Sequence, residues 1–384
     1  MKSCLLLLLS AFSLIAEDLT LKLDGIEDEI VVSLPENHNS EQNWPAILYY
    51  HGTNGRPQTQ LMRSQTGNED WIVVGMAYAQ RGPFQLTPEG MNAEIAVLKK
   101  VVAELKKKVN LDPTRVYASG FSKGGWMSGL LLQKERSLAG AVILGGGHLD
   151  RLPSAPKTLP TDTPVFIGVG REDRNYPASI RALVFFRKLG AKIDFESWDG
   201  LGHSFPRAGS ASLKEWLILR SGKQQDRKEL DTELAKMTAL PDKVTRWWSL
   251  LKFSERPFVS LEPELQAEVK ATLAKLEEDP AIAREARILK ESRRLLGKET
   301  SKISLETLEE VVAGYERIVK FAQDSPQRSA ASSDYERASE VLGYARKEYE
   351  AQLERAQEIE VKPETGRGFG NGTRRGFLRN PLVR

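Results

Sequence analysis

The sequence T-R-V-Y-A-S-G-F-S-K-G-G at residues 114–125 decides the fold prediction. Residues 115–119 are predicted to form a strand, and residues 125–134 a helix. The G-x-S-x-G motif between them places Ser122 on a sharp turn from strand to helix, where larger residues at positions 120 and 124 would clash with neighbouring elements. The helix N-terminus then points its amides at the place beside Ser122 where negative charge would develop. The motif therefore predicts a reactive serine.

The sequence around this motif alternates short apolar runs with helical patterns from residue 18 to residue 222. The predicted strands are residues 46–50, 71–77, 115–119, 141–144, 164–169 and 192–198. Apolar side chains that recur every three or four positions indicate an amphipathic helix over residues 91–109. Continuously apolar strands that alternate with such helices predict an α/β fold with a largely parallel sheet, buried on both faces.

The second half of the sequence has a different pattern. Leucine-rich helical patterns with many charged residues follow Gly222, and they predict an all-α region over residues 223–362. Two apolar stripes in this region are expected to bury against each other or against the first half. The stripes comprise Leu261, Leu265, Val269, Leu273 and Leu276, and Leu305, Leu308, Val312, Tyr315 and Val319. Interleaved acids and bases favour a solvated outer face over a membrane surface.

The two ends of the chain carry separate signals. Lys2 and an apolar run from Cys4 to Ala16 predict a secretory signal peptide over residues 1–16, because a membrane span needs about 20 apolar residues. The mature domain would begin at residue 17, and secretion or export to the periplasm is expected; an uncleaved anchor is the alternative. Residues 363–384 are rich in arginine and glycine and are predicted to be disordered. A solubilising role is favoured over contact with anionic glycans, envelope components or single-stranded nucleic acid.

Composition restricts the chemistry. The formal net charge of the 384 residues is only +3, so no nucleic-acid or membrane partner follows from charge. Cys4 is the single cysteine, which excludes an intrachain disulfide and a cysteine-based metal site. With four histidines in the sequence, a histidine-rich metal cluster is not expected either. We expect no metal and no cofactor.

Candidates for an acid and a base follow later predicted strands, in the order expected after a G-x-S-x-G motif. Asp173 follows strand 164–169 and is the candidate acid, with Glu172 as its rival. His203 follows strand 192–198 in a glycine-flanked loop and is the candidate base. His148 precedes Asp173, which breaks the expected order, so a substrate-contact or structural role is predicted for it. His38 is expected to be an exposed residue of a polar turn.

A second glycine-containing turn follows strand 46–50 and reads H-G-T-N-G at residues 51–55. Such a turn can offer a backbone N–H to an oxyanion. We assign one donor to Thr53, with Gly52 as the alternative, and the other to the N–H of Lys123. A structural role that braces the turn is predicted for the side chain of His51.

Taken together, these motifs resemble an α/β-hydrolase over residues 17–222. The sequence L-D-P-T-R-V-Y-A-S-G-F-S-K-G-G at residues 111–125 is similar to sequences of the branch that contains polyhydroxybutyrate depolymerases, feruloyl esterases and acetylxylan esterases. The resemblance implies a serine esterase in which Ser122 is acylated, His203 is the base and Asp173 orients it. Residues 223–384 have no counterpart in the core of that fold. Lys123 also departs from the branch, where a smaller or neutral residue is usual; its ammonium is expected to point to solvent, or alternatively to favour an anionic acyl group.

Three functions are compatible with these residues. The leading hypothesis is an exported serine esterase that acts on a small-molecule or polymer ester, such as an acyl group on polysaccharide or a polyester. A serine peptidase or amidase of the same fold is the second, and turnover of an aminoacyl amide would favour it. The third is a non-catalytic hydrolase scaffold that binds an envelope component or glycan through its helical half, and binding without turnover would favour it.

Overall fold

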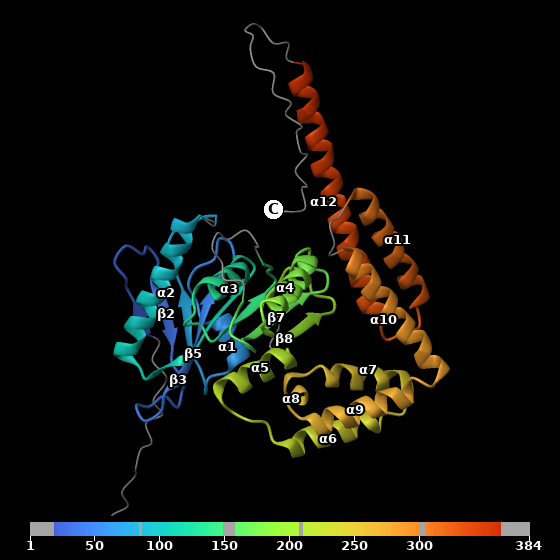
Figure 1. The fold of residues 1–384 in the computed structure, drawn as a ribbon, viewed down its shortest axis with the longest axis horizontal. Coiled ribbons are helices and arrows are strands. Elements are labelled where there is room, and N and C mark those ends of the chain that lie inside the picture. Colours follow the sequence, from blue (N-terminus) through green and yellow to red (C-terminus); the bar gives the residue numbers. More distant parts are fainter. Residues whose placement is uncertain (1–18, 84–86, 149–157, 207–209, 300–303, 362–384) are drawn as a thin grey trace, which may run out of the picture. The chain divides into compact units, whose positions relative to one another are not determined.

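The computed structural model describes residues 19–83, 87–148, 158–206, 210–299 and 304–361 (Figure 1). The predicted signal peptide and the predicted disordered tail lie outside these residues. The described chain divides into two compact units. The first comprises residues up to 168 together with 182–196 and 207–225, and the second comprises 169–181, 197–206 and the residues from 226 onward.

An eight-stranded sheet forms the centre of the α/β half, in the order β1-β2-β4-β3-β5-β6-β7-β8. β1 pairs antiparallel with β2, and β2 pairs antiparallel with β4. The pairs β4–β3, β3–β5, β5–β6 and β6–β7 are parallel. The strands are β1 (Leu19–Leu21), β2 (Ile30–Ser33), β3 (Trp44–Tyr50), β4 (Ile72–Met76), β5 (Leu111–Phe121), β6 (Gly140–Leu144), β7 (Pro164–Gly170) and β8 (Lys192–Trp198). The predicted α/β fold with a mostly parallel sheet is therefore confirmed.

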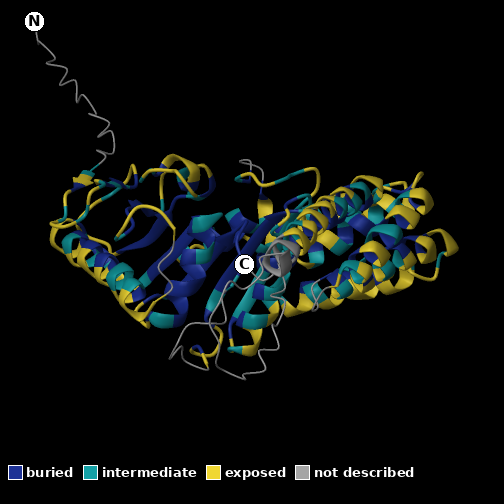
Figure 2. Ribbon diagram, turned by 90° about the horizontal axis from the view of Figure 1, so that it is seen from above, coloured by how far each residue is buried: buried dark blue, intermediate teal, exposed yellow. Residues whose placement is uncertain are grey.

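Side chains of the central strands are buried on both faces, as their continuously apolar sequences predict (Figure 2). Leu48, Ala118 and Ile143 belong to a core that includes helices α2 and α3, while the alternate residues point to the opposite face. On that opposite face, Tyr117 packs edge-on against Trp216. The helices of this half are α1 (Gln60–Thr66), α2 (Pro88–Lys108), α3 (Lys123–Lys134), α4 (Tyr176–Lys188) and α5 (Ala211–Ser221).

The two apolar runs that begin the sheet, β1 and β2, are absent from the sequence-based prediction. They have three and four residues, and both lie on the antiparallel side of the sheet. The predicted helix over residues 91–109 is confirmed as α2, which starts three residues earlier because Thr87 accepts a hydrogen bond from the N–H of Gly90 as its N-cap. β5 also starts earlier than predicted, at Leu111.

Only helices follow Gly222 within the residues that the structure describes. They are α6 (Arg227–Thr238), α7 (Lys243–Ser254), α8 (Pro257–Ser260), α9 (Pro263–Leu276), α10 (Pro280–Glu299), α11 (Leu305–Phe321) and α12 (Arg328–Val361). α9 packs against α7 and α8, whereas α11 packs against α10 and α12 (Figure 1). The two predicted stripes thus lie in separate helix groups.

The stripes themselves need a correction. On α9, Leu265, Val269 and Leu273 are buried as predicted, but Leu261 precedes the helix and is 44% exposed. On α11 the buried line is Leu308, Val311, Tyr315 and Ile318, and the predicted Val312 and Val319 are only partly buried beside it. The apolar face of α11 therefore consists of two adjacent rows of side chains and is wider than the single stripe that was predicted.

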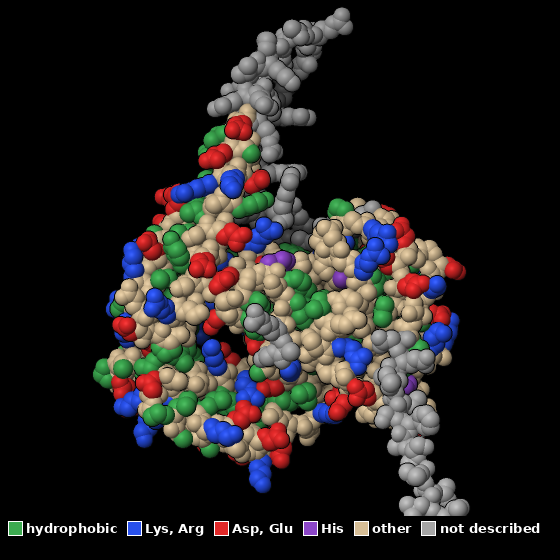
Figure 3. All heavy atoms as spheres, turned by 180° about the vertical axis from the view of Figure 1, so that it is seen from behind, with side chains coloured by type: hydrophobic (Ala, Val, Ile, Leu, Met, Phe, Trp, Pro, Cys, Tyr) green, Lys and Arg blue, Asp and Glu red, His purple; other side chains and the backbone are tan. Residues whose placement is uncertain are grey.

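The outer faces of these helices carry acidic and basic side chains side by side, as Figure 3 shows. Pairs such as Lys298–Glu310 and Arg346–Glu309 connect neighbouring helices at 2.6 and 2.8 Å. Among the described residues, no helix combines the length and the apolar character that a membrane crossing requires.

Candidate active site

Ser122 lies at the turn between β5 and α3, with a backbone φ of 55°. A non-glycine residue with positive φ is uncommon and strained. The neighbouring backbone fixes this conformation, because the Ser122 N–H donates to the Leu144 carbonyl at 2.8 Å and the Trp126 N–H donates to the Ser122 carbonyl at 3.1 Å. The predicted strand–turn–helix context of the motif is confirmed.

Both glycines of the motif are sterically required. A Cβ at Gly120 would lie 2.4 Å from the Gly124 carbonyl carbon, and a Cβ at Gly124 would lie 1.8 Å from the Tyr50 carbonyl oxygen. These are backbone atoms, which cannot move aside as the end of a flexible side chain can. The close approach of β3, β5 and α3 therefore fits only glycine at these positions.

The turn after β3 lies directly beside Ser122. A Cβ at Gly52 would lie 3.5 Å from the Ser122 Cβ, and the Gly55 N–H donates to the Gly52 carbonyl at 3.1 Å. His51 is buried, its Nδ1 is 2.7 Å from the Gly52 carbonyl oxygen, and its ring meets Tyr78 edge-on. Burial lowers the pKa of His51, against the opposing effect of its bond to Gly52. These contacts are those of a side chain that braces the turn.

Ser122 opens into a cavity of about 790 Å³. Thr53 and Lys123, the residues predicted to supply oxyanion donors, line this cavity together with Ser122. Lys123 is the first residue of α3, and the first N–H groups of a helix have no partner within the helix. The aromatic side chains of Tyr78 and Trp126 also line the cavity.

The Lys123 side chain does not extend into solvent, which corrects the preferred prediction. Its Nζ lies 3.8 Å from the centre of the Tyr78 ring and donates to the Gly82 carbonyl at 2.6 Å. Burial lowers the pKa of Lys123, and the charge of Glu94 opposes that effect. Lys123 therefore contributes its ammonium group to the wall of the cavity.

Glu94 is a residue near this site that the sequence did not predict. Its carboxylate accepts a hydrogen bond from the Ala79 N–H at 3.0 Å. Burial raises the pKa of Glu94 to about 7, while the Ala79 N–H and the charge of Lys123 act in the opposite direction. Glu94 lies on α2, within a helical pattern that gave no sign of a polar contact. The contact between Glu94 and Ala79 depends on the packing of α2 against the loop after β4, which the sequence does not show.

The cavity has further charged residues that sequence reasoning missed. Arg56, Arg81 and Asp28 line it. Arg81 is occupied by an ion pair, since its Nη2 donates to Asp28 Oδ1 at 2.5 Å. Because these residues come from three separate loops, no local pattern identified them.

In the second unit, the structure brings Asp173 and His203 together. The Nδ1 atom of His203 lies 2.7 Å from Oδ2 of Asp173, and Asp173 is only 1% exposed. The other carboxylate oxygen of Asp173 accepts from the Asn175 N–H at 2.8 Å. The rival Glu172 instead accepts a hydrogen bond from Ser333 on α12 at 2.8 Å. Of the two adjacent carboxylates, Asp173 is the one that orients the imidazole.

The remaining histidines have structural contacts. His148 stacks on Phe185 with ring centres 4.4 Å apart. His38 was expected to be exposed, but it is partly buried against Trp44, with ring centres 5.7 Å apart, and burial lowers its pKa. Within the described ranges, no cluster of three histidine, cysteine or acidic residues has a geometry that could hold a metal ion.

Comparisons with known proteins agree with this description. Residues 77–236, less than half of the chain, match the family model described as "Dienelactone hydrolase family". The carboxylesterase SOBER1 of Arabidopsis thaliana is 24% identical over 208 residues, which are 45% of this chain and 90% of that protein. Feruloyl esterase B of Piromyces equi is 27% identical over 108 residues, 26% of this chain and 20% of that enzyme.

Among solved structures, an S-formylglutathione hydrolase from Agrobacterium tumefaciens is 14% identical with a TM-score of 0.41, over 54% of this chain and 94% of the other. The sheet, the serine turn and the family match together define this protein as an α/β-hydrolase. Within that superfamily, residues 77–236 are similar to the dienelactone hydrolase family, and the chain is a carboxylesterase-type hydrolase.

Proposed function

We propose that this protein is a serine esterase in which Ser122, His203 and Asp173 act as a catalytic triad. The strained turn at Ser122, beside the Gly52 turn and open to a cavity, is the observation that carries the proposal. The pair of His203 and Asp173 at 2.7 Å supplies the base and its orienting acid. These residues follow β5, β7 and β8, and ligands of α/β proteins bind at the carboxyl ends of such strands.

In the proposed reaction, Ser122 Oγ attacks the ester carbonyl carbon while His203 Nε2 takes the hydroxyl proton. Asp173 accepts a hydrogen bond from Nδ1–H, which selects the tautomer with a basic Nε2. The N–H groups of Thr53 and Lys123 stabilise the oxyanion. His203 returns the proton to the departing alkoxide, which leaves as an alcohol, and water then releases the acid by the same steps in reverse.

For the substrate, we propose an acyl ester carried on polysaccharide or a polyester. The cavity volume of about 790 Å³ accommodates an acyl chain or an aromatic acyl group, and Tyr78 and Trp126 offer aromatic surfaces for it. The relative feruloyl esterase B supports this class. Export through residues 1–16 is proposed for the same reason, because a polymer too large to enter a cell must be hydrolysed outside it.

The proposal is tested by hydrolysis of p-nitrophenyl acetate, butyrate and octanoate. We expect turnover in the wild type, and a loss in Ser122→Ala that leaves only background hydrolysis. Ser64→Ala, an exposed serine outside the cavity, is the matched control and should keep the full rate. A stoichiometric burst of p-nitrophenol, with an acyl group on the Ser122 peptide by mass spectrometry, would identify the acyl-enzyme. Full activity of Ser122→Ala would refute the triad.

The substrate class has its own test. Release of acid from acetylated or feruloylated xylan is compared with release from a polyhydroxybutyrate film and from an aminoacyl p-nitroanilide. We expect release of acid from a polymer ester and no release of p-nitroaniline from the anilide. Faster cleavage of the anilide would identify an amidase instead.

Export has a separate test. N-terminal sequencing of the protein after expression in a secreting host shows whether the chain is cleaved after Ala16.

A further inference from the structure

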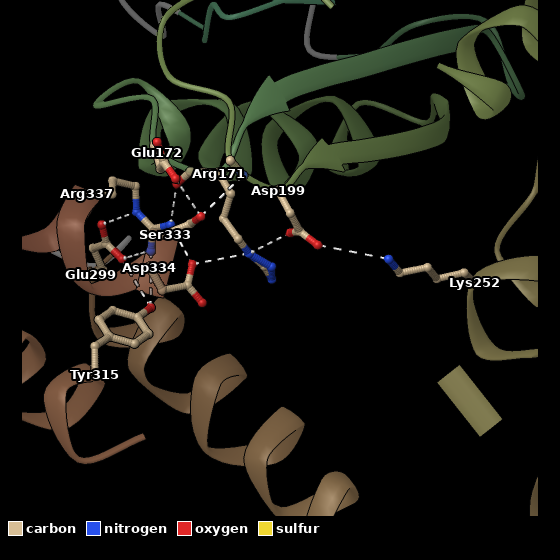
Figure 4. A network of polar contacts seen from close by, with 10 residues as sticks. Arg171, Glu172, Asp199, Lys252, Glu299, Tyr315, Ser333, Asp334 and Arg337 are labelled. Atoms are coloured by element: carbon tan, nitrogen blue, oxygen red, sulfur yellow. Dashed lines mark hydrogen bonds and ion pairs between the residues drawn. The ribbon is translucent and has the colours of Figure 1, made fainter. Parts of the chain in front are cut away.

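A buried network of polar contacts joins α12 to the loops that carry Asp173 and His203 (Figure 4). Its centre is Arg337, whose side chain is entirely inaccessible to solvent. Arg337 donates from Nε and Nη2 to the two carboxylate oxygens of Glu299 at 2.9 and 2.7 Å, and from Nη1 to Asp334 at 2.6 Å. Tyr315 donates its hydroxyl proton to Glu299 at 3.2 Å.

Arg337 contacts the Asp173 loop on both sides of Asp173. Its Nη1 also donates to the Arg171 backbone carbonyl at 2.8 Å, two residues before Asp173. Its guanidinium carbon lies 4.4 Å from the centre of the Tyr176 ring, three residues after Asp173. A planar group with five donors is suited to such a clamp, because it can bind two carboxylates and a carbonyl while stacking on a ring.

Neighbouring residues of α12 contact both loops as well. Ser333 donates to Glu172 at 2.8 Å and accepts a hydrogen bond from the Gly200 N–H at 3.3 Å. Asp334 accepts from Nε of Arg171 at 3.4 Å. One turn of α12 therefore contacts the loop before α4 and the loop after β8.

The two loops also lie directly against each other. The Arg171 N–H donates to the Trp198 carbonyl at 2.9 Å and the Glu172 N–H to the Leu201 carbonyl at 3.0 Å. A Cβ at Gly170 would lie 2.1 Å from the Leu201 carbonyl oxygen, so this approach leaves no room for a side chain. Displacement of either loop would therefore change the geometry between Asp173 and His203.

A buried arginine is costly unless it is fully paired, and a well-packed apolar residue often gives equal stability. Burial alone would lower the pKa of Arg337, but the charges of Glu299 and Asp334 outweigh it and raise that pKa well above its usual value. The guanidinium stays charged, and its bond to the Arg171 carbonyl is one that an apolar residue cannot replace.

We propose that Arg337 is a positioning residue of the esterase, which holds the Asp173 loop so that Asp173 keeps the His203 imidazole in its working orientation. The inference rests on the proposed function of Asp173 and His203. It gives the helical half a task in the reaction: α12 fixes the acid–base pair without touching the substrate.

The test compares Arg337→Met and Arg337→Lys with the wild type in p-nitrophenyl butyrate hydrolysis. We expect Arg337→Met to lower kcat about 10- to 100-fold, because small displacements of catalytic groups have effects of this size. KM should stay within about twofold, because Arg337 does not line the cavity. Arg337→Lys keeps the charge, but its single nitrogen cannot make all the contacts of the guanidinium, so we expect it to restore only part of kcat.

Glu285→Gln is the matched control for loss of a buried charge. Glu285 is 3% exposed and accepts hydrogen bonds from Trp248 and Ser325, but it has no described contact with either loop. Circular dichroism shows the temperatures at which each variant is folded, and the kinetics are measured at a temperature where all of them are. If Glu285→Gln lowers kcat as much as Arg337→Met, the loss reflects general destabilisation and the proposal is wrong.

A second readout is independent of turnover. The proton between His203 Nδ1 and Asp173 should give a low-field proton resonance in the wild type that is missing in His203→Asn. We expect it to broaden through faster exchange in Arg337→Met, and in Ser333→Ala if Arg337→Met does not fold. If the folded variants keep both the resonance and kcat while Ser122→Ala is inactive, the proposal for Arg337 is wrong. If Ser122→Ala is itself active, the proposed function is wrong instead.

Discussion

At the scale of single residues, the site depends on which of two adjacent carboxylates faces the histidine. Asp173 is bonded to His203, while Glu172 is bonded to Ser333. The Tyr176 N–H donates to the Asp173 carbonyl at 2.8 Å, so the start of α4 fixes the loop in this orientation.

This difference predicts losses of kcat of very different size in two conservative variants. Asp173→Asn should lower kcat by about 10⁴-fold, because the amide no longer selects the correct imidazole tautomer, yet a residual rate should remain from oxyanion stabilisation and binding. Glu172→Gln keeps an acceptor for Ser333. It should retain at least about a tenth of the wild-type kcat, because only the charge of one hydrogen bond is lost. Steady-state kinetics decide between them, and the reverse pattern would make Glu172 the acid.

Glu94 predicts a pH dependence of stability. Its pKa is raised from 4.5 to about 7 in the folded protein, so the folded state binds more protons than the unfolded state between these values. The free energy of unfolding should therefore fall as pH rises from about 5 to about 7. In Glu94→Gln this fall should be smaller, because the amide oxygen still accepts from Ala79 but does not ionise.

Urea unfolding at several pH values measures this effect. Glu89→Gln, an exposed glutamate in the first turn of the same helix, is the control and should follow the wild type. Parallel pH curves for the wild type and Glu94→Gln would show that the raised pKa of Glu94 is not a property of the folded protein.

At the scale of elements, the turn between β5 and α3 was predictable because its constraints are local. A strand, a serine between two glycines and a helix follow in order, and the glycines are required by backbone contacts at positions 120 and 124. The predicted strands and α2 were also correct to within a few residues. β1 and β2 were missed because three or four residues are too few for a periodic signal.

Substitution of the second glycine tests this constraint. Gly124→Ala should lower the free energy of unfolding by about 1–3 kcal/mol or more and remove turnover, because the new methyl group overlaps the Tyr50 carbonyl. Gly343→Ala, in α12, is the matched control: nothing lies within 4 Å of a Cβ there. That variant should gain about 0.5–1 kcal/mol in urea unfolding. Equal effects of the two substitutions would contradict the steric argument.

At the scale of the whole molecule, the acid and base loops group with the helical half. Residues 169–181 and 197–206 belong to the same compact unit as α6–α12. The serine and the cavity that it opens into belong to the other unit. A boundary drawn after Gly222 in the sequence therefore differs from the division by contacts, which groups the loops of Asp173 and His203 with the helices after Gly222.

This grouping predicts the outcome of truncation. A chain that ends at Gln225 keeps Ser122, Asp173 and His203 but loses Ser333, Asp334 and Arg337, and we expect kcat to fall about 100-fold or more. A chain that ends at Val361 keeps these contacts and should match the full-length enzyme. Hydrolysis of p-nitrophenyl butyrate by the purified chains measures both, and full kcat in the shorter one would show that the helical half has no part in the reaction.

Sequence patterns predicted the α/β fold, the serine turn with its glycines, and the candidates Asp173 and His203, because these depend on neighbouring residues and on strand ends. The folded structure was needed to show which carboxylate pairs with His203, where the Lys123 side chain lies, and that Glu94 lies beside that residue. It also joined Arg337 to a carbonyl 166 residues away. Such contacts form because buried charged groups must find partners wherever folding brings them together, and no local pattern encodes that meeting.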